Sequence, residues 1–549
     1  MRKNILYTLI AVFLSSSLFA QGDKDKTIFK AMQDCMNRTK EELVLPNMPL
    51  AFYLSYSYAC AAQFNVVGEL GSIIYSDYKP QNSLANLDLL IGDYQSNNEL
   101  RFAGVFPQVN MPIDNDYYVI RRNLWMLSDV CYKKALQEFA GKQAYLKNKP
   151  ESPEIAALPD LIKIEPINYV EKNTTSFDVD MKKFETLVKD LSSEFKQYKE
   201  LESSQVNMNG LYMDVYKTTT ENVILKKNLG YIQIKASASM ISEEGTRLNS
   251  SYSKTFKSTD EIPPIEEIKL GIKNMMVKLH ELDNAPKFDE YYSGPVMFED
   301  GMAMNIFSSY LLNGEALYGN RMPVGRPSGN NLVNRIGRKV IDSRITIKNY
   351  TDKKEYNGKK LYGHYEVDAC GVKPDSEMTL VDKGIFRQML CGNFPSVKNL
   401  KSTGSSRFIC TAQNVVYTVA PGTIHIQVEK GLKQSKMKKA LLKAAKDADL
   451  KYAFIVRSSA GLLLMYRVDV KNGKESLLKD CELSGLNLQK LEKMIQISNE
   501  ESVSNLFVSN GVLASVIYPK SIILDNIEIN KSHPQKVEKP SLVSPMERK

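Results

Sequence analysis

Two spacings of hydrophobic residues alternate along the chain. Between segments of helical period, alternating apolar and polar residues predict strands, first in "AFYLSYSYACAAQFNVVGELGSIIYSDY" and then in "SLANLDLLIGDY". Apolar residues recur at the helical period in six segments, at residues 27–42, 116–147, 182–203, 264–282, 436–448 and 486–498. In the second of these helices we expect Trp125, Leu127 and Leu136 on the apolar side.

The second half of the chain is dominated by predicted short strands. It follows a hairpin that we expect to turn at Glu244 and Gly245. The strands are "RITIKNY", "HYEVDACGV", "MTLVDKGIFRQML", "TIHIQVEKG", "KYAFIVRS" and "GLLLMYRVDVKNGK". We therefore predict an α+β fold, with an N-terminal α+β domain over residues 21–285 and a mainly antiparallel β domain with a few helices over residues 286–529. Residues 530–549 are polar and proline-bearing, and we expect them to be disordered.

The N-terminus has the layout of a signal peptide. A chain of 549 residues is too long for one hydrophobic core, which agrees with the two predicted domains. Residues 1–20 precede these domains as a separate leader. Arg2 and Lys3 precede an apolar run over residues 5–14, and Ala20 precedes the expected cleavage point. That run is too short to span a bilayer. We expect an exported protein, periplasmic or secreted, with no membrane segment after cleavage.

Charge and cysteine content narrow the possible partners. The formal charge is +9, and 63 acidic residues are interspersed with the basic ones, so we expect no nucleic-acid partner. The seven cysteines form no CxxC pair. An odd and scattered set leaves one disulfide possible but does not make a disulfide framework.

Few residues offer chemistry in a recognisable pattern. The four histidines are far apart and form no HxH or HExxH pair, so a local helical zinc site is absent, while a site assembled from distant residues stays open. They are His280, His364, His425 and His533. The chain also contains no GxSxG, GxxxxGK[ST] or GxGxxG motif. One Ser/Gly loop could offer backbone N–H groups to an anion or a peptide carboxylate, although a plain turn is the favoured interpretation. Its residues are Lys401, Ser402, Thr403 and Gly404.

The segment "YYSGPVMFEDGMAMNIFSSYLLNG" has the layout of an active-site segment. A small-residue turn and an apolar stretch precede Glu299 and Asp300, and an amphipathic helix follows. Adjacent residues of a helix do not face each other, so the two acids are not a paired acid and base. We expect both at the helix N-terminus, where a negative charge stabilises by about 0.3–1 kcal/mol.

Six segments follow one another in a characteristic order. They are "YYSGPVMFED", "GRKVIDSRITI", "EVDACGV", "LVDKGIFRQML", "LKSTGSSR" and "GVLASVIYPKSIILDNIEI". This order resembles the TldD/PmbA (TldE) family, described as metalloproteases or modulators of DNA gyrase, most clearly over residues 285–404 and 511–529. The resemblance implies, for catalytic TldD-type subunits, an HExxxH helix whose histidines bind zinc and whose glutamate activates water. A cysteine from the C-terminal part completes that ligand set.

This chain departs from the zinc motif at each ligand. The two histidine positions correspond to Phe298 and Ala303, which cannot coordinate zinc, and the glutamate corresponds to Glu299. The family's D-x-E-G-[VT] segment has Cys370 in place of its glutamate, and residues 511–529 contain no cysteine. These departures resemble the PmbA/TldE type, which lacks zinc and pairs with a TldD-type partner. We expect Phe298 to fill the would-be zinc pocket.

The resemblance implies a non-catalytic, TldE-like subunit of an exported TldD/TldE-type zinc metalloprotease acting on peptides. The expected partner is a TldD-like catalytic paralogue or a second copy, and zinc is expected only in the catalytic partner. The export signal is similar to that of secreted Bacteroidetes-type members. An active hydrolase with a non-standard site and a stand-alone peptide-binding protein that uses exposed strand edges stay open as alternatives. The candidate site residues are Glu299 as the catalytic remnant and, for binding, Phe298, Ala303, Lys401, Ser402, Thr403 and Gly404.

Overall fold

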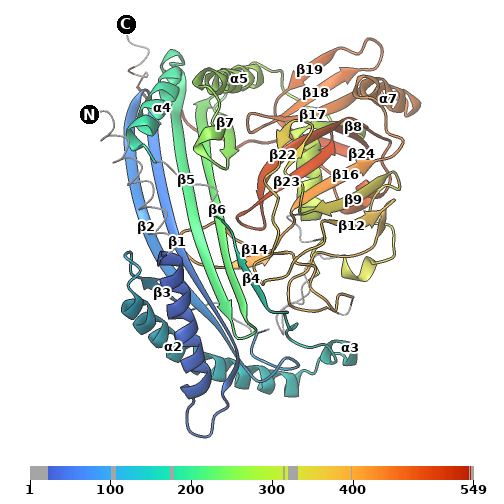
Figure 1. Cartoon of the computed structure of the whole chain (residues 1–549). Helices are drawn as coiled ribbons and strands as arrows, with labels where there is room; N and C mark the ends of the chain where they lie inside the picture. The colour runs from blue at the N-terminus through green and yellow to red at the C-terminus, as the bar shows by residue number, and fades with distance from the viewer. Residues whose placement is uncertain are drawn as a thin grey trace, which may run out of the picture.

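The chain forms one long curved sheet and two further large sheets (Figure 1). The computed structural model describes residues 23–99, 107–172, 179–312, 316–319, 332–396, 398–542 and 545. The expected signal peptide, residues 1–20, therefore lies outside the described residues. Helices combine with mostly antiparallel strands, which confirms the predicted α+β class. The domain boundary at residue 285 stays a prediction, although every strand of the long sheet precedes it.

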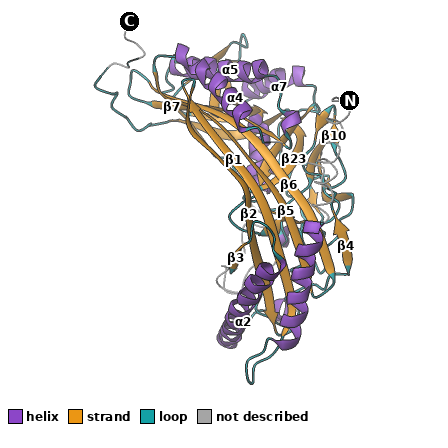
Figure 2. Ribbon diagram, turned by 60° about the vertical axis from the view of Figure 1, so that its left-hand side comes forward, coloured by secondary structure: helices purple, strands orange, loops and turns teal. Residues whose placement is uncertain are grey.

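The long sheet has the strand order β3-β2-β1-β5-β6-β4, with β7 also paired to β6. Four of its strands contain 19 or 20 residues, whereas strands usually have about five or six. The sheet consequently runs the full height of the molecule and bends along its length (Figure 2). Its strands are β1 (Ala51–Glu69), β2 (Ser72–Ile91), β3 (Gln108–Met111), β4 (Ile167–Val170), β5 (Leu201–Thr219), β6 (Val223–Ile241) and β7 (Arg247–Phe256). Only β4 pairs in parallel.

The two faces of the long sheet have different neighbours. Because side chains alternate along a strand, even positions of β1 such as Tyr56 and Val66 face the helices. A helix over residues 23–42 and α2 cover one end of this face, and α4 and α5 cover the other. Odd positions of β1 and β5, such as Ala59 and Met213, face the C-terminal part of the chain. The helices are α2 (Tyr117–Asn148), α3 (Pro153–Ala156), α4 (Met181–Ser193) and α5 (Ile265–Asp283).

Two mixed sheets enclose the core of the C-terminal part. Their orders are β13-β12-β9-β16-β23-β22 and β19-β18-β17-β8-β24-β20, with β21 on β24. The first contains β9 (Ile345–Tyr350), β12 (Glu377–Asp382), β13 (Ile385–Phe386), β16 (Thr423–Val428), β22 (Glu501–Val508) and β23 (Val512–Pro519). The second contains β8 (Tyr292–Asp300), β17 (Tyr452–Ser459), β18 (Leu462–Asp469), β19 (Glu475–Leu478), β20 (Cys481–Ser484), β21 (Gln496–Ile497) and β24 (Ser521–Lys531).

Smaller elements complete the C-terminal part. α6 (Gly301–Phe307) follows β8 directly, and α7 (Gln434–Asp447) packs on the outer side of the second sheet. Two short hairpins lie beside the sheets, β10 (Glu355–Tyr356) with β11 (Lys359–Lys360), and β14 (Ser406–Phe408) with β15 (Tyr417–Val419). None of the helices that the structure describes is long and apolar enough to cross a membrane.

Several predicted elements are confirmed, and others differ for identifiable reasons. The hairpin of β6 and β7 turns at Gly245, whose φ of 81° suits glycine. The expected helix over residues 182–203 ends at Ser193, where a short 3-10 helix (Glu194–Gln197) follows, and β5 begins at Leu201. Trp125 is 52% exposed, since it follows the buried Leu124 by about 100° around the helix.

Two C-terminal predictions are wrong. Residues 486–498 form only a short 3-10 helix (Leu488–Glu492) before β21, which pairs with the distant β24. The segment "HYEVDACGV" is a loop, so His364 is not in a strand.

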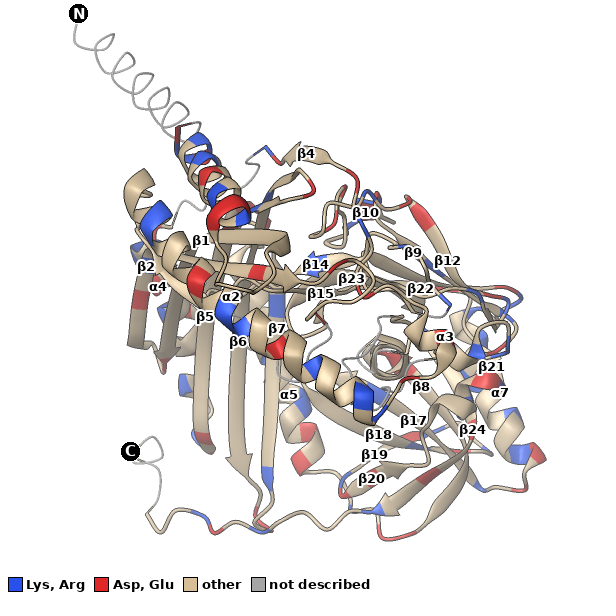
Figure 3. Cartoon of the chain, turned by 90° about the horizontal axis from the view of Figure 1, so that it is seen from below, with Lys and Arg blue, Asp and Glu red and all other residues tan. Residues whose placement is uncertain are grey.

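The cysteines, the C-terminal tail and the charges along α5 can be compared with the sequence predictions. All seven cysteines are free thiols, so the disulfide left open by the sequence is not formed. The tail expected to be disordered contributes the end of β24, and its Lys536 forms a bridge with Thr246. Acidic and basic residues are interspersed along α5 (Figure 3).

Candidate functional site

Of the two acids expected at the helix N-terminus, Asp300 is the N-cap residue of α6, whereas Glu299 still lies in β8. β8 continues through Glu299 to Asp300, and α6 begins only at Gly301. The strand is held on both sides, because Phe298 pairs in register with Val456 of β17 and with Ile522 of β24. These pairings keep residues 298–300 in strand conformation, where the local sequence predicted the start of a helix.

Phe298 and Glu299 point to opposite faces of the second sheet. Successive side chains of a strand alternate in direction. Phe298 is fully buried in the core between the two C-terminal sheets, whereas Glu299 lies on the side that α7 covers. Ala303, also fully buried, lies in α6. The three positions that correspond to HExxxH therefore do not converge on one point.

Glu299 belongs to an ion-pair network that crosses the α7 face. Its Oε2 accepts a hydrogen bond from Arg457 Nε at 2.6 Å, and its Oε1 accepts one from Gln434 Nε2 at 3.3 Å. Arg457 also donates to Glu475 at 2.8 Å, and Lys438 pairs with the same Glu475 at 2.7 Å. Burial lowers the pKa of Arg457, but the hydrogen bonds that Arg457 donates to Glu475 and Glu299 outweigh it and raise that pKa. The carboxylate of Glu299 is thus occupied by a cation and does not stabilise a helix N-terminus.

Backbone groups of the Ser/Gly loop form hydrogen bonds with other residues of the protein. Thr403 donates its N–H to the Cys391 carbonyl at 3.2 Å, and Gly404 donates its N–H to Ser402 Oγ at 3.1 Å. The Gly404 carbonyl accepts from the Tyr365 hydroxyl at 2.9 Å. The plain-turn interpretation fits these contacts, because the N–H groups of Thr403 and Gly404 are not directed to a ligand. Lys401 is exposed.

Asp368 organises the neighbouring "DACGV" turn. Its carboxylate accepts backbone N–H groups from Val372 at 2.8 Å, Cys370 at 2.9 Å and Ser406 at 3.1 Å. Burial raises the pKa of Asp368 to about 6, although the three N–H groups oppose this shift. Burial also raises the pKa of Cys370 to about 12, which disfavours its nucleophilic thiolate. This segment is a structural turn that ties a loop to β14.

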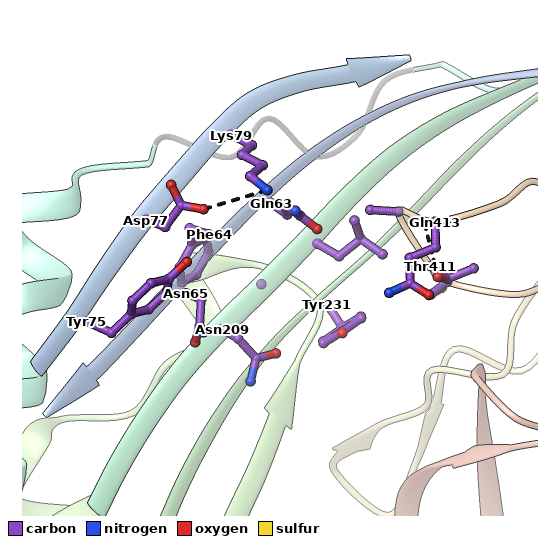
Figure 4. Close-up of a pocket in the computed structure, with 14 residues that line it drawn as sticks. Gln63, Phe64, Asn65, Tyr75, Asp77, Lys79, Asn209, Tyr231, Thr411 and Gln413 are labelled. Atoms are coloured by element: carbon purple, nitrogen blue, oxygen red, sulfur yellow. Dashed lines mark hydrogen bonds and ion pairs between the residues drawn. The ribbon is translucent and has the colours of Figure 1, made fainter. Parts of the chain in front are cut away.

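A polar hollow of about 370 Å³ lies on the face of the long sheet that meets the C-terminal part (Figure 4). Gln63, Asn65 and Asn209 line it from β1 and β5. Asp77 and Lys79 of β2 line it as an ion pair at 4.0 Å. Its lining is therefore rich in amides and balanced in charge.

A second cavity on the same face has a different character. It measures about 510 Å³ and lies between β4, β6, β14, β23 and the loop over residues 362–369. Lys227, Lys257 and Arg407 line it together, although they come from three separate segments. Sequence analysis missed these cations. The sequence feature that could have indicated them is a lysine within an alternating apolar strand, as at Lys227, because a lysine side chain is rarely buried without a partner.

Metal ligands are not gathered in the described part of the chain. No group of three or more His, Cys, Asp or Glu residues there is arranged to hold a metal ion. His425 of β16 instead pairs with Glu501 at 2.8 Å, and His280 of α5 pairs with Glu200 at 3.0 Å.

Comparison with known proteins gives a likeness of fold. No family model matches the chain, and no curated protein matches it. The solved structure of TldE from Thermococcus kodakarensis is similar with a TM-score of 0.57 and 12% identity, covering 91% of this chain and 100% of that one. A candidate modulator of a DNA gyrase from Thermotoga maritima gives 0.53 and 13%, covering 87% and 96%. A candidate modulator of DNA gyrase from Bacteroides thetaiotaomicron gives 0.55 and 10%, covering 91% and 98%. The chain thus has the fold of these TldE-type and modulator proteins over most of its length.

Proposed function

We propose that this chain is the non-catalytic, TldE-like subunit of an exported TldD/TldE-type zinc metalloprotease that acts on peptides. The observation that carries the proposal is the placement of Glu299, which faces Arg457 while its neighbour Phe298 faces the core. The fold shared with TldE from Thermococcus kodakarensis supports the same assignment.

Zinc hydrolysis needs a geometry that this junction does not provide. Two imidazoles must converge on the metal, and a carboxylate must reach the bound water. Here the first ligand position is the phenyl ring of Phe298 and the second is the methyl group of Ala303. Glu299 lies on the other side of the strand from Phe298, so restoring a metal at that position would not bring its water to this carboxylate.

In the proposed assembly the two chains have separate tasks. The partner, a TldD-like paralogue, supplies the zinc and the water-activating glutamate. This chain supplies a rigid scaffold whose hollowed sheet face helps to enclose a peptide. We expect residues 1–20, which have the layout of a signal peptide, to direct the assembly to the periplasm or outside the cell.

The proposal is tested by purification from the native envelope. We expect the chain to co-purify with a second protein that carries HExxxH, and the complex to show chelator-sensitive peptidase activity. The isolated chain is expected to lack both stoichiometric zinc and that activity. A stable monomer in the envelope would overturn the partnership, and zinc-dependent activity of the isolated chain would overturn the non-catalytic role.

A further inference from the structure

The 510 Å³ cavity is lined by an excess of positive charge. Its charged lining residues are the cations Lys172, Lys227, Lys257, Lys354 and Arg407 and the acids Glu171 and Glu366. With histidine neutral, the lining carries three more positive than negative charges, and β4 and β6 of the long sheet face the C-terminal part across it. We call it the cation cavity.

Three of these cations lie over tyrosine rings. Lys227 Nζ is 4.8 Å from the centre of the Tyr169 ring, and Lys257 Nζ is 5.6 Å from that of Tyr362. The Arg407 guanidinium is 4.1 Å from the centre of the Tyr365 ring. A ring face attracts a cation by roughly 0.5–2 kcal/mol without neutralising its charge. The cations are thus positioned while their charge stays available.

Carboxylate partners are scarce at these cations. Among the described residues, Lys227 pairs with Glu171 at 3.6 Å, whereas neither Lys257 nor Arg407 forms an ion pair. The Lys227 side chain is only 8% exposed, and its buried Nζ has no hydrogen-bond partner among the described residues. Arg407 donates to the Pro421 carbonyl at 2.9 Å, which fixes the guanidinium without neutralising it.

The ionisation of the lining responds to this arrangement. Burial and then the charge of Arg407 lower the pKa of Lys257 to about 8. Burial, followed by Lys354 and Lys257, lowers the pKa of His364. Burial also lowers the pKa of Lys227. Desolvated like charges of this kind repel one another at a cost in free energy, and a bound anion lowers that cost.

We propose that the cation cavity binds a small organic anion, whose oxyanion is held by Lys227, Lys257 and Arg407. A cavity of this size falls within the roughly 300–1,000 Å³ of small-molecule sites. The aromatic and aliphatic lining, including Phe408, Leu229 and Val512, accommodates an apolar body attached to the anionic group. The shared chemistry is a carboxylate or phosphate oxyanion. The proposal does not depend on the partnership proposed above.

Titration calorimetry on the full chain tests this assignment with defined probes. The probes are N-acetylphenylalanine, N-acetylphenylalanine amide and phenyl phosphate, which share an aromatic body but differ in charge. We expect at least one of the two acids to bind and the amide not to bind. The better acid identifies whether a carboxylate or a phosphate is preferred.

Lysine variants locate the binding. Lys257→Met and Lys227→Met each keep the aliphatic stem and remove the charge, and we expect each to weaken binding of the acid about tenfold or more. Lys254→Met is the matched control, because Lys254 is exposed on β7, outside the cavity lining. Circular dichroism confirms that each variant is folded. Absence of binding by both acids, equal binding of the amide, or unchanged binding in both cavity variants would overturn the proposal.

Discussion

The charged side chains are paired with opposite charges at the β8–α6 junction, whereas those of the cation cavity are mostly unpaired within the described part of the chain. At the junction, Arg457 lies between Glu299 and Glu475, and each charge has an opposite partner within hydrogen-bond distance. In the cavity, Lys257 and Arg407 lie over tyrosine rings and form no ion pair among the described residues. Paired charges stabilise a local arrangement, whereas unpaired, desolvated charges of one sign are typical of binding sites.

This contrast indicates a ligand-binding role for the cation cavity and a structural role for the β8–α6 junction. The junction has the sequence layout of an active site, yet its side chains are used for packing and pairing. The cation cavity has no sequence motif, yet it gathers unneutralised cations around an open volume of about 510 Å³. Four variants distinguish the two regions, and they follow in order of decreasing effect.

The largest effect is expected at the core side of β8. Phe298→His combined with Ala303→His removes a buried phenyl ring and buries imidazoles without designed partners, so we expect the free energy of unfolding to fall by about 3–5 kcal/mol. Urea denaturation measures this change. Zinc peptidase activity is not expected to appear, because Glu299 faces α7 and the third ligand is absent. Phe298→Leu is the conservative control. Tight zinc binding with peptidase activity in the double variant would contradict the junction's structural role.

The next largest effect is expected at Asp368, whose carboxylate is used by the backbone beside the cavity. Asp368→Ala leaves three backbone N–H groups without their acceptor, and we expect a loss of about 3 kcal/mol in unfolding free energy. The pKa of Asp368 is raised to about 6 in the fold, so its stabilisation is complete below pH 3.8 and declines as pH rises through 6. The loss should therefore be larger at pH 4 than at pH 7. Asp375→Ala, at an exposed position nearby, is the control.

Sequence reasoning located the fold better than the site. Alternation along β1, β2 and the β6–β7 hairpin is a local signal, and the long sheet follows from it. The expected helix over residues 486–498 failed because β21 is stabilised by β24, a strand about 26 residues further along. Local periodicity does not contain such pairings.

The candidate site shows the same limit more sharply. The order of segments identified Phe298 and Glu299 as positions of the HExxxH motif. The directions of their side chains, however, depend on pairing with β17 and β24, which lie far along the chain. The cavity cations come from β6, the residue after β7, and β14. Residues so widely separated converge only through the tertiary fold, so no spacing in the sequence predicts their cluster.

Arg457 gives an intermediate effect that tests the paired region directly. Arg457→Met leaves two partly buried carboxylates, Glu299 and Glu475, without their shared cation, and we expect a loss of about 1–2 kcal/mol in unfolding free energy. Arg467→Met is the matched control, because its pair with Glu290 at 3.5 Å is more exposed and should contribute about 0.5 kcal/mol or less. Equal losses in the two variants would show that the network at β8 has no special role.

The smallest effect, and one of opposite sign, is expected at Lys257. Lys257→Met removes a desolvated cation that faces Arg407 and His364, with Glu261 and Glu171 as the nearest acids, so we expect unfolding free energy at pH 7 to rise by about 1 kcal/mol.

The pH dependence of that difference identifies its cause. The pKa of Lys257 is lowered from 10.5 to about 8 in the fold, so between these values the unfolded chain binds more protons than the folded one. Stability of the unsubstituted chain therefore rises over this interval relative to Lys257→Met. The advantage of the variant should be greatest below pH 8 and disappear as pH approaches 10.5, whereas Lys254→Met should show no such trend. A Lys257→Met variant that is less stable than the unsubstituted chain at pH 7 would show that the cavity's charge is neutralised in the fold, as it is at the junction.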